Sequence, residues 1–398
     1  MVDEPRSGRG RTQLNRMSRG FVLAAAACVL IGCTPALTVT RESGVETASP
    51  PTPVVAQIDA PAVRDPTIVS IRMFDEENGW AVSQERILRT ADGGATWHDV
   101  SPNAGSTLGY AACSYFLDNL HAWVLVPNSD DMLRGILYRS GDGGLTWNEL
   151  PVPFGGGNMQ FLDAKQGWMM ASLGAGAGSM AVSVFQTADA GASWTQTFTD
   201  DPTQSGADQS LPLGGLKDGI TAISMQAAWI GGVTYAPGTV YLFQTKNGGH
   251  SWEKSRVAAP AGYGQAELET TGPTFLTADT GYLPVHVSSQ NGILLAIYVT
   301  HDGGNSWVQS PTYVPKGGVS DFYSETAGFA WNGTSFYASS DSAQNWTTVN
   351  PDVAFSAGFS GMDFVSPRVG FVLFDDGAGN RYVYKSVDGG ATWNILGQ

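Results

Sequence analysis

The 398-residue chain has little cysteine and little histidine. It contains three cysteines and five histidines, and no Cys/His spacing is of the kind that holds zinc. No P-loop or dinucleotide fingerprint follows an expected strand, because the many glycines fall in turns. We therefore expect no disulfide framework, no metal and no cofactor.

Positive charge is also scarce. Lys and Arg total 21 against 36 Asp and Glu, which gives a net charge of −15. Removal of residues 1–32 as a leader would take away five arginines and two acidic residues and leave −18. An acidic surface argues against nucleic acid and against charge-driven adhesion to anionic lipid. It favours solubility and cationic or metal-bridged partners.

The N-terminus has the layout of an export signal. Five arginines precede the 11-residue apolar run FVLAAAACVLI at 21–31, which is too short to span a bilayer. The run ends in Leu30-Ile31-Gly32-Cys33, which resembles the lipobox of bacterial lipoproteins. That resemblance implies removal of residues 1–32, lipidation of Cys33, and a protein anchored to the outer face of a bacterial membrane. The alternative is an ordinary cysteine within a signal peptide.

A Thr-, Pro- and Ala-rich segment follows at 33–66 and is typical of an extended, semi-rigid tether. Of the three cysteines, Cys28 lies in the leader and Cys33 takes the lipid, which leaves Cys113 as a small, buried apolar residue. We assign residues 67–398 to one folded domain.

That domain contains seven copies of a turn motif, Ser/Thr-x-Asp-x-Gly-x-Ser/Thr-Trp, some of them degenerate. The final tryptophans lie 39 to 58 residues apart, a period typical of propellers and solenoids. The third and eighth positions of the seven boxes are Asp92 and Trp97, Asp142 and Trp147, Asp189 and Trp194, Asn247 and Trp252, Asp302 and Trp307, Asp341 and Trp346, and Asp388 and Trp393.

Two further positions recur before each box. An aromatic slot residue follows a small residue, and an apolar anchor lies six or seven residues before the slot. The slots are Trp80, Trp123, Trp168, Trp229, Tyr282, Phe329 and Phe371, and the anchors are Phe74, Phe116, Phe161, Ile223, Phe275, Phe322 and Phe364. Each repeat reads as four short antiparallel strands, which predicts an all-β, seven-bladed β-propeller of four-stranded meanders. With every blade contiguous, we expect ring closure by packing alone, although the segment before Thr67 could still donate a strand.

The box residues suit a tight turn. An Asp carboxylate can accept hydrogen bonds from backbone N–H groups one or two residues on, and Gly at the fifth position allows a positive φ. The copy SSDSAQNW carries Ala343 and Asn345 in place of Gly and Thr, so we expect it to be the loosest. The carboxylates could be imagined as catalytic groups or Ca²⁺ ligands. Symmetry instead places each on a separate blade, so we assign them a structural role.

The repeat over 67–398, of the form FxDxxxGWAV…ILRTxDGGxTW, resembles the propeller of the photosystem II assembly and stability factor family. More broadly, it resembles bacterial-neuraminidase-repeat (Asp-box) proteins. The nearest segments are Phe74, Gly79-Trp80, Arg89-Thr90 and 92–97. The resemblance implies a non-catalytic, surface-anchored scaffold that binds and helps to assemble other proteins, in that family those of a photosynthetic membrane complex. A basic patch would be expected for that role, whereas this chain is acidic.

The alternative is a glycoside hydrolase or a glycan-binding propeller. Sialidases with Asp boxes need an arginine cluster, a Tyr–Glu nucleophile pair and an acid Asp. Most arginines here lie next to boxes or in hairpins, and no Arg-Ile-Pro motif opens the first repeat. Sialidase activity is therefore disfavoured, while another two-carboxylate hydrolase stays open.

Any binding site is expected on one particular face. In a meander blade, the slot turn and the box lie at one end of the strands, and the second hairpin and the inter-blade linkers lie at the other. Loops on a rigid scaffold commonly carry function. The long linkers 195–216 and 253–271 and two hairpins place there Asp130, Asp131, Asp200, Asp201, Asp208, Tyr263, Glu267, Glu269, Asp375 and Asp376. The alternative is that these are merely solvated acidic loops.

Overall fold

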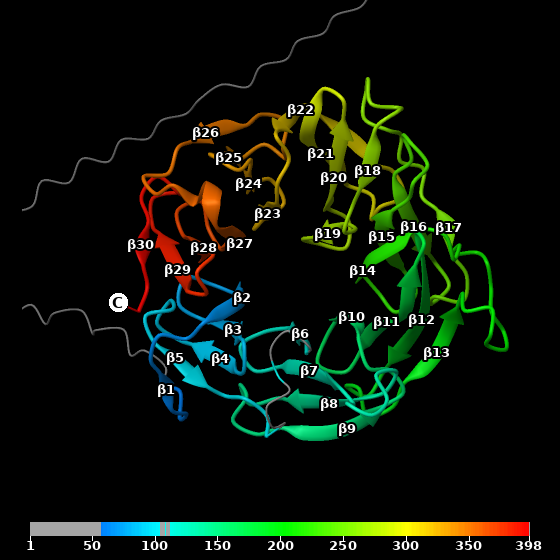
Figure 1. Cartoon of the computed structure of the whole chain (residues 1–398), viewed down its shortest axis with the longest axis horizontal. Coiled ribbons are helices and arrows are strands. Elements are labelled where there is room, and N and C mark those ends of the chain that lie inside the picture. Colours follow the sequence, from blue (N-terminus) through cyan, green and yellow to red (C-terminus); the bar gives the residue numbers. More distant parts are fainter. Residues whose placement is uncertain (1–56, 104–107, 109–111, 398) are drawn as a thin grey trace, which may run out of the picture. The chain divides into compact units, whose positions relative to one another are not determined.

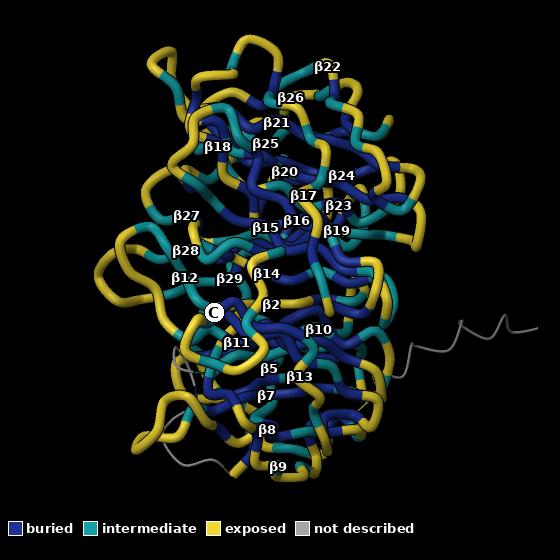
Figure 2. The backbone as a smooth tube through the Cα atoms, turned by 90° about the vertical axis from the view of Figure 1, so that its right-hand side faces the viewer, coloured by how far each residue is buried: buried dark blue, intermediate teal, exposed yellow. Residues whose placement is uncertain are grey.

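The computed structural model describes residues 57–103, 108 and 112–397. Within them, β-sheets stand around a common centre like the blades of a propeller (Figure 1). The leader 1–32, Cys33 and most of the expected tether lie outside the described residues. Figure 2 shows the strands largely buried and the connecting loops largely exposed. The all-β propeller expected from the repeats is confirmed.

Seven successive groups of strands form the blades, each running from an inner to an outer strand. The first three blades are β2 (Ile68–Met73), β3 (Gly79–Ser83), β4 (Ile87–Thr90) and β5 (Trp97–Asp99); β6 (Cys113–Phe116), β7 (Ala122–Pro127), β8 (Gly135–Ser140) and β9 (Asn148–Val152); and β10 (Gly157–Phe161), β11 (Gly167–Gly176), β12 (Ser179–Thr187) and β13 (Thr195–Thr199).

The last four blades are β14 (Leu216–Ala222), β15 (Ala228–Val233), β16 (Tyr241–Thr245) and β17 (Glu253–Lys254); β18 (Glu267–Glu269), β19 (Thr274–Phe275), β20 (Gly281–Ser289), β21 (Gly292–Thr300) and β22 (Val308–Pro315); β23 (Ser320–Phe322), β24 (Gly328–Trp331), β25 (Phe336–Ser339) and β26 (Thr347–Val349); and β27 (Phe359–Phe364), β28 (Gly370–Asp375), β29 (Arg381–Ser386) and β30 (Asn394–Ile395). A short 3₁₀ turn, Phe355–Ala357, precedes the seventh blade.

Blade five has its inner strand in two pieces. Both β18 and β19 pair with β20, the first through Glu269 opposite His286 and the second through Thr274 opposite Tyr282. Glu269 also lies opposite Val233 of β15, so β18 joins blades four and five into one continuous sheet. Part of the expected 253–271 linker is therefore strand.

A further short strand, β1 (Ala62–Val63), lies outside the seven meanders. It pairs with the outer strand of blade one, with Ala62 opposite His98, and the carbonyl of Ala60 is 2.7 Å from His98 Nδ1. Ile58 is buried in the core between blades one and two. The sequence placed this segment in the tether, whereas in the structure it is attached to blade one.

Ring closure involves no exchange of strands. The four strands of blade seven all come from the C-terminal segment, and β27 lies beside β2 of blade one (Figure 1). Apolar side chains of the two blades fill the space between them, among them Met73, Leu88 and Trp97 on one side and Phe371 and Leu373 on the other. The ring thus closes without a swapped strand, as the contiguous repeats suggested. Side-chain packing is joined there by hydrogen bonds between the blades, among them that from the Met73 N–H to Asp363 and those from Lys385 to the carbonyls of Glu76 and Gly93.

The slot and anchor residues form the contacts between blades. The slot ring of one blade lies against the anchor of the next at five interfaces, pairing Trp80 with Phe116, Trp123 with Phe161, Trp229 with Phe275, Tyr282 with Phe322, and Phe329 with Phe364 at 3.6 to 5.0 Å between centroids. The four slot tryptophans are fully buried. They belong to the core of the propeller.

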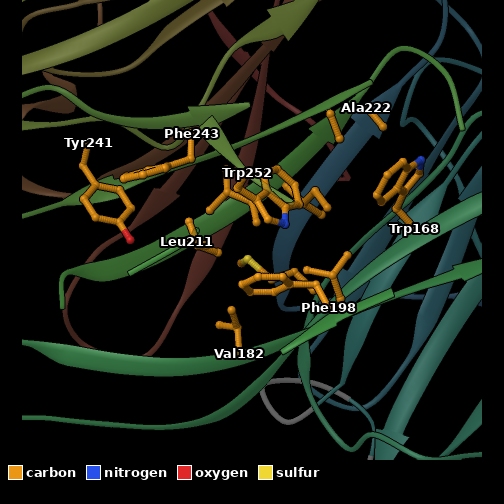
Figure 3. Packing of buried hydrophobic residues seen from close by; sticks show 13 residues of the cluster. Trp168, Val182, Phe198, Leu211, Ala222, Tyr241, Phe243 and Trp252 are labelled. Carbon is orange, nitrogen blue, oxygen red and sulfur yellow. The ribbon is translucent and has the colours of Figure 1, made fainter. Parts of the chain in front are cut away.

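Two anchors were placed one residue too late. In five blades the anchor pairs with the small residue before the slot, seven positions before the slot itself. Met73 and Ala222 take that place in blades one and four, not Phe74 and Ile223. Neither is aromatic, which is why the pattern of phenylalanines misled the assignment. Figure 3 shows the interface of blades three and four, where Trp168 lies near the small Ala222 and where Phe198 and Trp252 add bulk.

Candidate binding face

Each box is a closed hydrogen-bonded turn. The carboxylate or amide oxygen at the third position accepts the backbone N–H four residues on, at 2.8 to 3.1 Å in all seven copies. The donor lies further along than the one or two residues expected. The first-position hydroxyl accepts the N–H of the fifth residue and donates to the third, as Thr90 does with Gly94 and Asp92.

The box of blade six keeps these bonds despite its altered sequence. Asn345 Nδ2 donates to Asp341 Oδ2 at 2.8 Å, in the place of a Ser or Thr hydroxyl. Ser342 and Ala343 adopt φ values of 59° and 61°, where most copies have glycine. The difference in this turn is therefore backbone strain and not a lost hydrogen bond. That it is the loosest box stays a prediction.

The box also fixes one face of the propeller. In every blade the N–H of the fourth box residue donates to a carbonyl in the turn between the first two strands, from Gly93 to Glu77 in blade one through Gly389 to Arg368 in blade seven. These two kinds of turn therefore share one end of the blades, here called the box face. The opposite end, with the second hairpins and the inter-blade linkers, is the hairpin face.

Electrostatics supports a structural role for the box carboxylates. The pKa of each box Asp is lowered. In Asp189, Asp341 and Asp388 the main cause is the hydrogen bond from the side chain four residues on. In Asp92, Asp142 and Asp302 desolvation is the largest effect and raises the pKa, but the combined hydrogen bonds outweigh it. These groups stay ionised and serve their own turns.

One candidate residue of the hairpin face is not at the surface. Asp200 is fully buried, with Oδ2 2.9 Å from Lys217 Nζ and Oδ1 accepting the N–H of Val182. Lys217 Nζ also donates to the carbonyls of Met180 and Pro212. The assignment of Asp200 to a binding surface was therefore wrong. Through Lys217 and Val182, Asp200 attaches the linker between blades three and four to the strands of those blades.

The other acidic candidates are at least partly exposed, and most serve their own loops. Asp201 accepts the N–H of Thr203, Asp208 that of Ser210, and Asp376 that of Ala378. Asp131 lies 3.5 Å from Arg134, and Asp375 lies 2.9 Å from Arg381. Asp130, Glu267 and Glu269 are exposed, and the Tyr263 ring lies edge-on to that of Tyr313. The structure thus leaves Asp130, Glu267 and Glu269 as the most available carboxylates of this set.

Apolar side chains also reach the solvent on the hairpin face. Met132 and Leu133 at the tip of the β7–β8 hairpin are 64% and 53% exposed, and Tyr235 after β15 is 75% exposed. Exposed large apolar residues of this kind often form the central contacts of protein interfaces. The sequence reasoning missed these apolar residues, because it selected carboxylates and Tyr263 on this face.

Sequence reasoning also missed a polar position on the inner strands, immediately before each structural anchor. Its occupants are Arg72, Tyr115, Gln160, Thr221, Thr274, Asp321 and Asp363. Gln160, Asp321 and Asp363 each accept the backbone N–H of the anchor in the next blade, at Ala222, Phe364 and Met73. A polar residue directly before the anchor was visible in the sequence. Its hydrogen-bond partner could not be recognised there, because the partners of Gln160, Asp321 and Asp363 lie about 40 to 290 residues away along the chain.

Chemistry elsewhere in the described residues is sparse. Burial raises the pKa of the Cys113 thiol to about 11, so it is a poor nucleophile. Within the ranges given above, no group of three or more His, Cys, Asp or Glu side chains is arranged to hold a metal ion. The same residues include no helix long and apolar enough to cross a membrane.

The fold and its turns define the class of this protein as a β-propeller whose blades carry Asp-box turns. No family model matches the chain. It is similar to the photosystem II assembly lipoprotein Ycf48 of Synechococcus sp. (strain CC9902), with 25% identity over 271 residues, which cover 61% of this chain and 75% of that protein.

Solved structures show the same fold. One is described as YCF48 bound to D1 peptide and has a TM-score of 0.52, with 17% identity over 82% of this chain and 96% of that one. Another is an ancestral GH74 enzyme, with a TM-score of 0.50 and 12% identity over 87% of this chain and 48% of that one. The chain thus resembles an assembly-factor propeller in sequence and in fold, and a glycoside hydrolase in fold.

Proposed function

We propose that this protein is a non-catalytic propeller that binds a segment of another protein during assembly of a membrane complex. The observation that carries the proposal is the similarity to the assembly lipoprotein Ycf48 along most of the propeller. The box carboxylates are committed to their own turns, which further favours a scaffold over a hydrolase built on them.

The proposed binding surface is the hairpin face. Met132, Leu133 and Tyr235 supply exposed apolar contact area, and Asp130 and Glu267 supply negative charge beside it. Apolar anchors within a charged rim are typical of protein interfaces. The acidic rim favours a partner segment that carries Lys or Arg.

We also propose export and attachment to the outer face of a membrane through lipid on Cys33. The basic leader, the apolar run and the lipobox-like sequence support this. Incorporation of a labelled fatty acid tests it. Loss of the label in Cys33→Ala, with retention in Cys113→Ala, would agree with the proposal, whereas equal labelling of both variants would contradict it.

Binding is tested with a fluorescent D1 peptide as the probe, because that ligand is bound in the similar propeller. Saturable binding is expected, and charge reversal in Asp130→Lys with Glu267→Lys should change the Kd by about fivefold or more. Glu149→Lys on the outer strand β9 is the matched control and should leave the Kd unchanged. An equal effect of both variants would argue against the hairpin face.

A second assay covers other partners. The lipidated protein is used to capture subunits from detergent-solubilised membranes, and the same hairpin-face variant is compared with Glu149→Lys. Stoichiometric membrane-complex subunits lost only with the hairpin-face variant would support the assembly role. No D1 binding and no captured subunit would overturn it, and oligosaccharides would then be screened for the glycan-binding or hydrolase alternative.

A further inference from the structure

Two carboxylates occupy the same position on successive inner strands, at the junctions of blade six with seven and of blade seven with one. Asp321 of β23 precedes the anchor of blade six, and Asp363 of β27 precedes that of blade seven. Each reaches forward across a blade boundary. Asp321 Oδ2 accepts the N–H of Phe364 at 2.6 Å, and Asp363 Oδ2 accepts the N–H of Met73 at 2.5 Å.

The second of these contacts crosses the junction of blades seven and one, which no peptide linker joins within the described residues. Blades one to seven follow one another along the chain, so blades seven and one are held by side-chain packing and hydrogen bonds. Asp363 is a central part of that junction, because its Oδ1 also lies 3.6 Å from Arg72 Nη1 of β2. Its side chain is 7% exposed, while that of Arg72 is 57% exposed.

The charges at this site do not balance. The carboxylates of Asp321 and Asp363 are close enough to repel each other electrostatically. One guanidinium, that of Arg72, attracts both of them. The next titratable group is Tyr115 of β6, which interacts with Arg72 and whose pKa burial raises. Asp363 is buried and Asp321 is partly buried. Two such carboxylates that share one cation repel each other, and a proton on one of them relieves that repulsion.

Because Asp321 Oδ2 accepts the N–H of Phe364, the residue directly after Asp363, and Asp363 lies against the single guanidinium of Arg72, we propose that the two carboxyl groups hold one proton between them and that its loss weakens the closure of the ring between blades six, seven and one. The result is a pH-responsive clasp built into the fold, independent of any ligand. Protonation leaves one carboxylate to pair with Arg72, while both side chains keep an oxygen that accepts the backbone N–H of the next blade.

Electrostatics agrees with this arrangement. Burial, followed by the charge of Asp363, raises the pKa of Asp321 to about 7, and burial raises that of Asp363 despite Arg72. A folded-state pKa above the unfolded value near 4 means that the folded protein binds the extra proton. The stabilising contribution of this proton is therefore fully present only below the unfolded value near 4, and it is lost progressively as the pH rises from there through the folded-state value.

The experiment is equilibrium unfolding of the full chain in urea between pH 6 and pH 8. For one group titrating near 7, the folding equilibrium constant should be about tenfold lower at pH 8 than at pH 6. Asp321→Asn keeps an oxygen for the Phe364 N–H and should remove most of this dependence. The matched control Asp130→Asn, an exposed carboxylate, should retain it. A wild-type protein without the dependence, or an Asp321→Asn variant that keeps it, would overturn the proposal.

A second measurement needs no variant. In protein with ¹³C-labelled aspartate carboxyl groups, one resonance is expected to titrate between pH 6 and 8. Over the same range, hydrogen-exchange protection of the Met73 and Phe364 amides, corrected for intrinsic exchange, should fall. If all aspartate carboxyls titrate below pH 5, no proton is shared and the proposal fails.

Discussion

The indole of Trp123 lies parallel to the ring of Phe161 in the next blade, with 3.6 Å between centroids and 7° between planes. Trp123 Nε1 also donates to the carbonyl of Ala190 in that blade. One residue therefore joins two blades both by stacking and by a hydrogen bond. The same slot-to-anchor stacking recurs at four other interfaces of the ring.

Removal of one such anchor should be costly. Phe161→Ala leaves a cavity against Trp123 and Trp194, and we expect a loss of about 3–5 kcal/mol in the free energy of unfolding. Urea unfolding measures it. Leu145→Ala, at an exposed box position, should change stability by no more than about 0.5 kcal/mol. Similar losses for the two variants would show that the stack contributes little.

The box of blade four allows a test of the conserved turn chemistry. Asn247 Nδ2 donates a hydrogen bond to the Ser251 hydroxyl. In the six boxes that have Asp at this position, the carboxylate instead accepts a hydrogen bond from the side chain four residues on. Asn247→Asp should stabilise the protein by up to about 1 kcal/mol at pH 6. Because box Asp pKa values lie below the unfolded value near 4, the gain is present above that pH and is lost as the pH falls through the folded-state pKa. Asp302→Asn is the reciprocal control and should show the opposite sign; a pH-independent effect would contradict the assignment.

Backbone strain in blade six makes a separate prediction. Ser342 is a non-glycine residue at φ 59°. Ser342→Gly removes the strain, because glycine adopts a positive φ without steric cost. The substitution also removes the weak 3.3 Å hydrogen bond from the Ser342 hydroxyl to the carbonyl of Glu325. We expect a net increase of a few tenths to about 1 kcal/mol in the free energy of unfolding, measured by thermal denaturation. The neighbouring exposed Ser340→Gly, where φ is not positive, should be neutral or destabilising. Equal effects at both positions would rule out strain as the cause.

The buried Lys217–Asp200 pair should tolerate single changes poorly. Desolvation lowers the pKa of Lys217, and hydrogen bonding and attraction to Asp200 oppose that effect. Lys217→Met leaves a buried carboxylate unpaired and should cost about 3–5 kcal/mol. The double variant with Asp200→Asn retains an acceptor for the Val182 N–H and should recover part of the loss in a double-mutant cycle. Additive losses would mean that the two side chains act independently.

Much of this fold could be predicted from the repeat, because each blade repeats the same local turn. Trp97, the box carboxylates and the slot aromatics are recognisable from spacing alone. Anchors Met73 and Ala222 were misplaced because their type departs from the pattern. Asp200 looked like a surface acid because its partner, Lys217, lies 17 residues away across a linker. The exposed tips at Met132 and Tyr235 were missed because burial depends on how far each hairpin extends.

Each blade presents a slot ring on one side and an anchor on the other, so the slot-to-anchor contact between blades is directional. When such head-to-tail contacts close into a ring, every blade has the same kind of neighbour on each side. The contacts themselves therefore do not determine which blade comes first in the sequence. The junction between blades seven and one, made without a linker, repeats this relationship through Phe371 and Met73. A circular permutant that links blade seven to blade one and opens the chain between two other blades is therefore expected to keep the slot-to-anchor contacts around the ring.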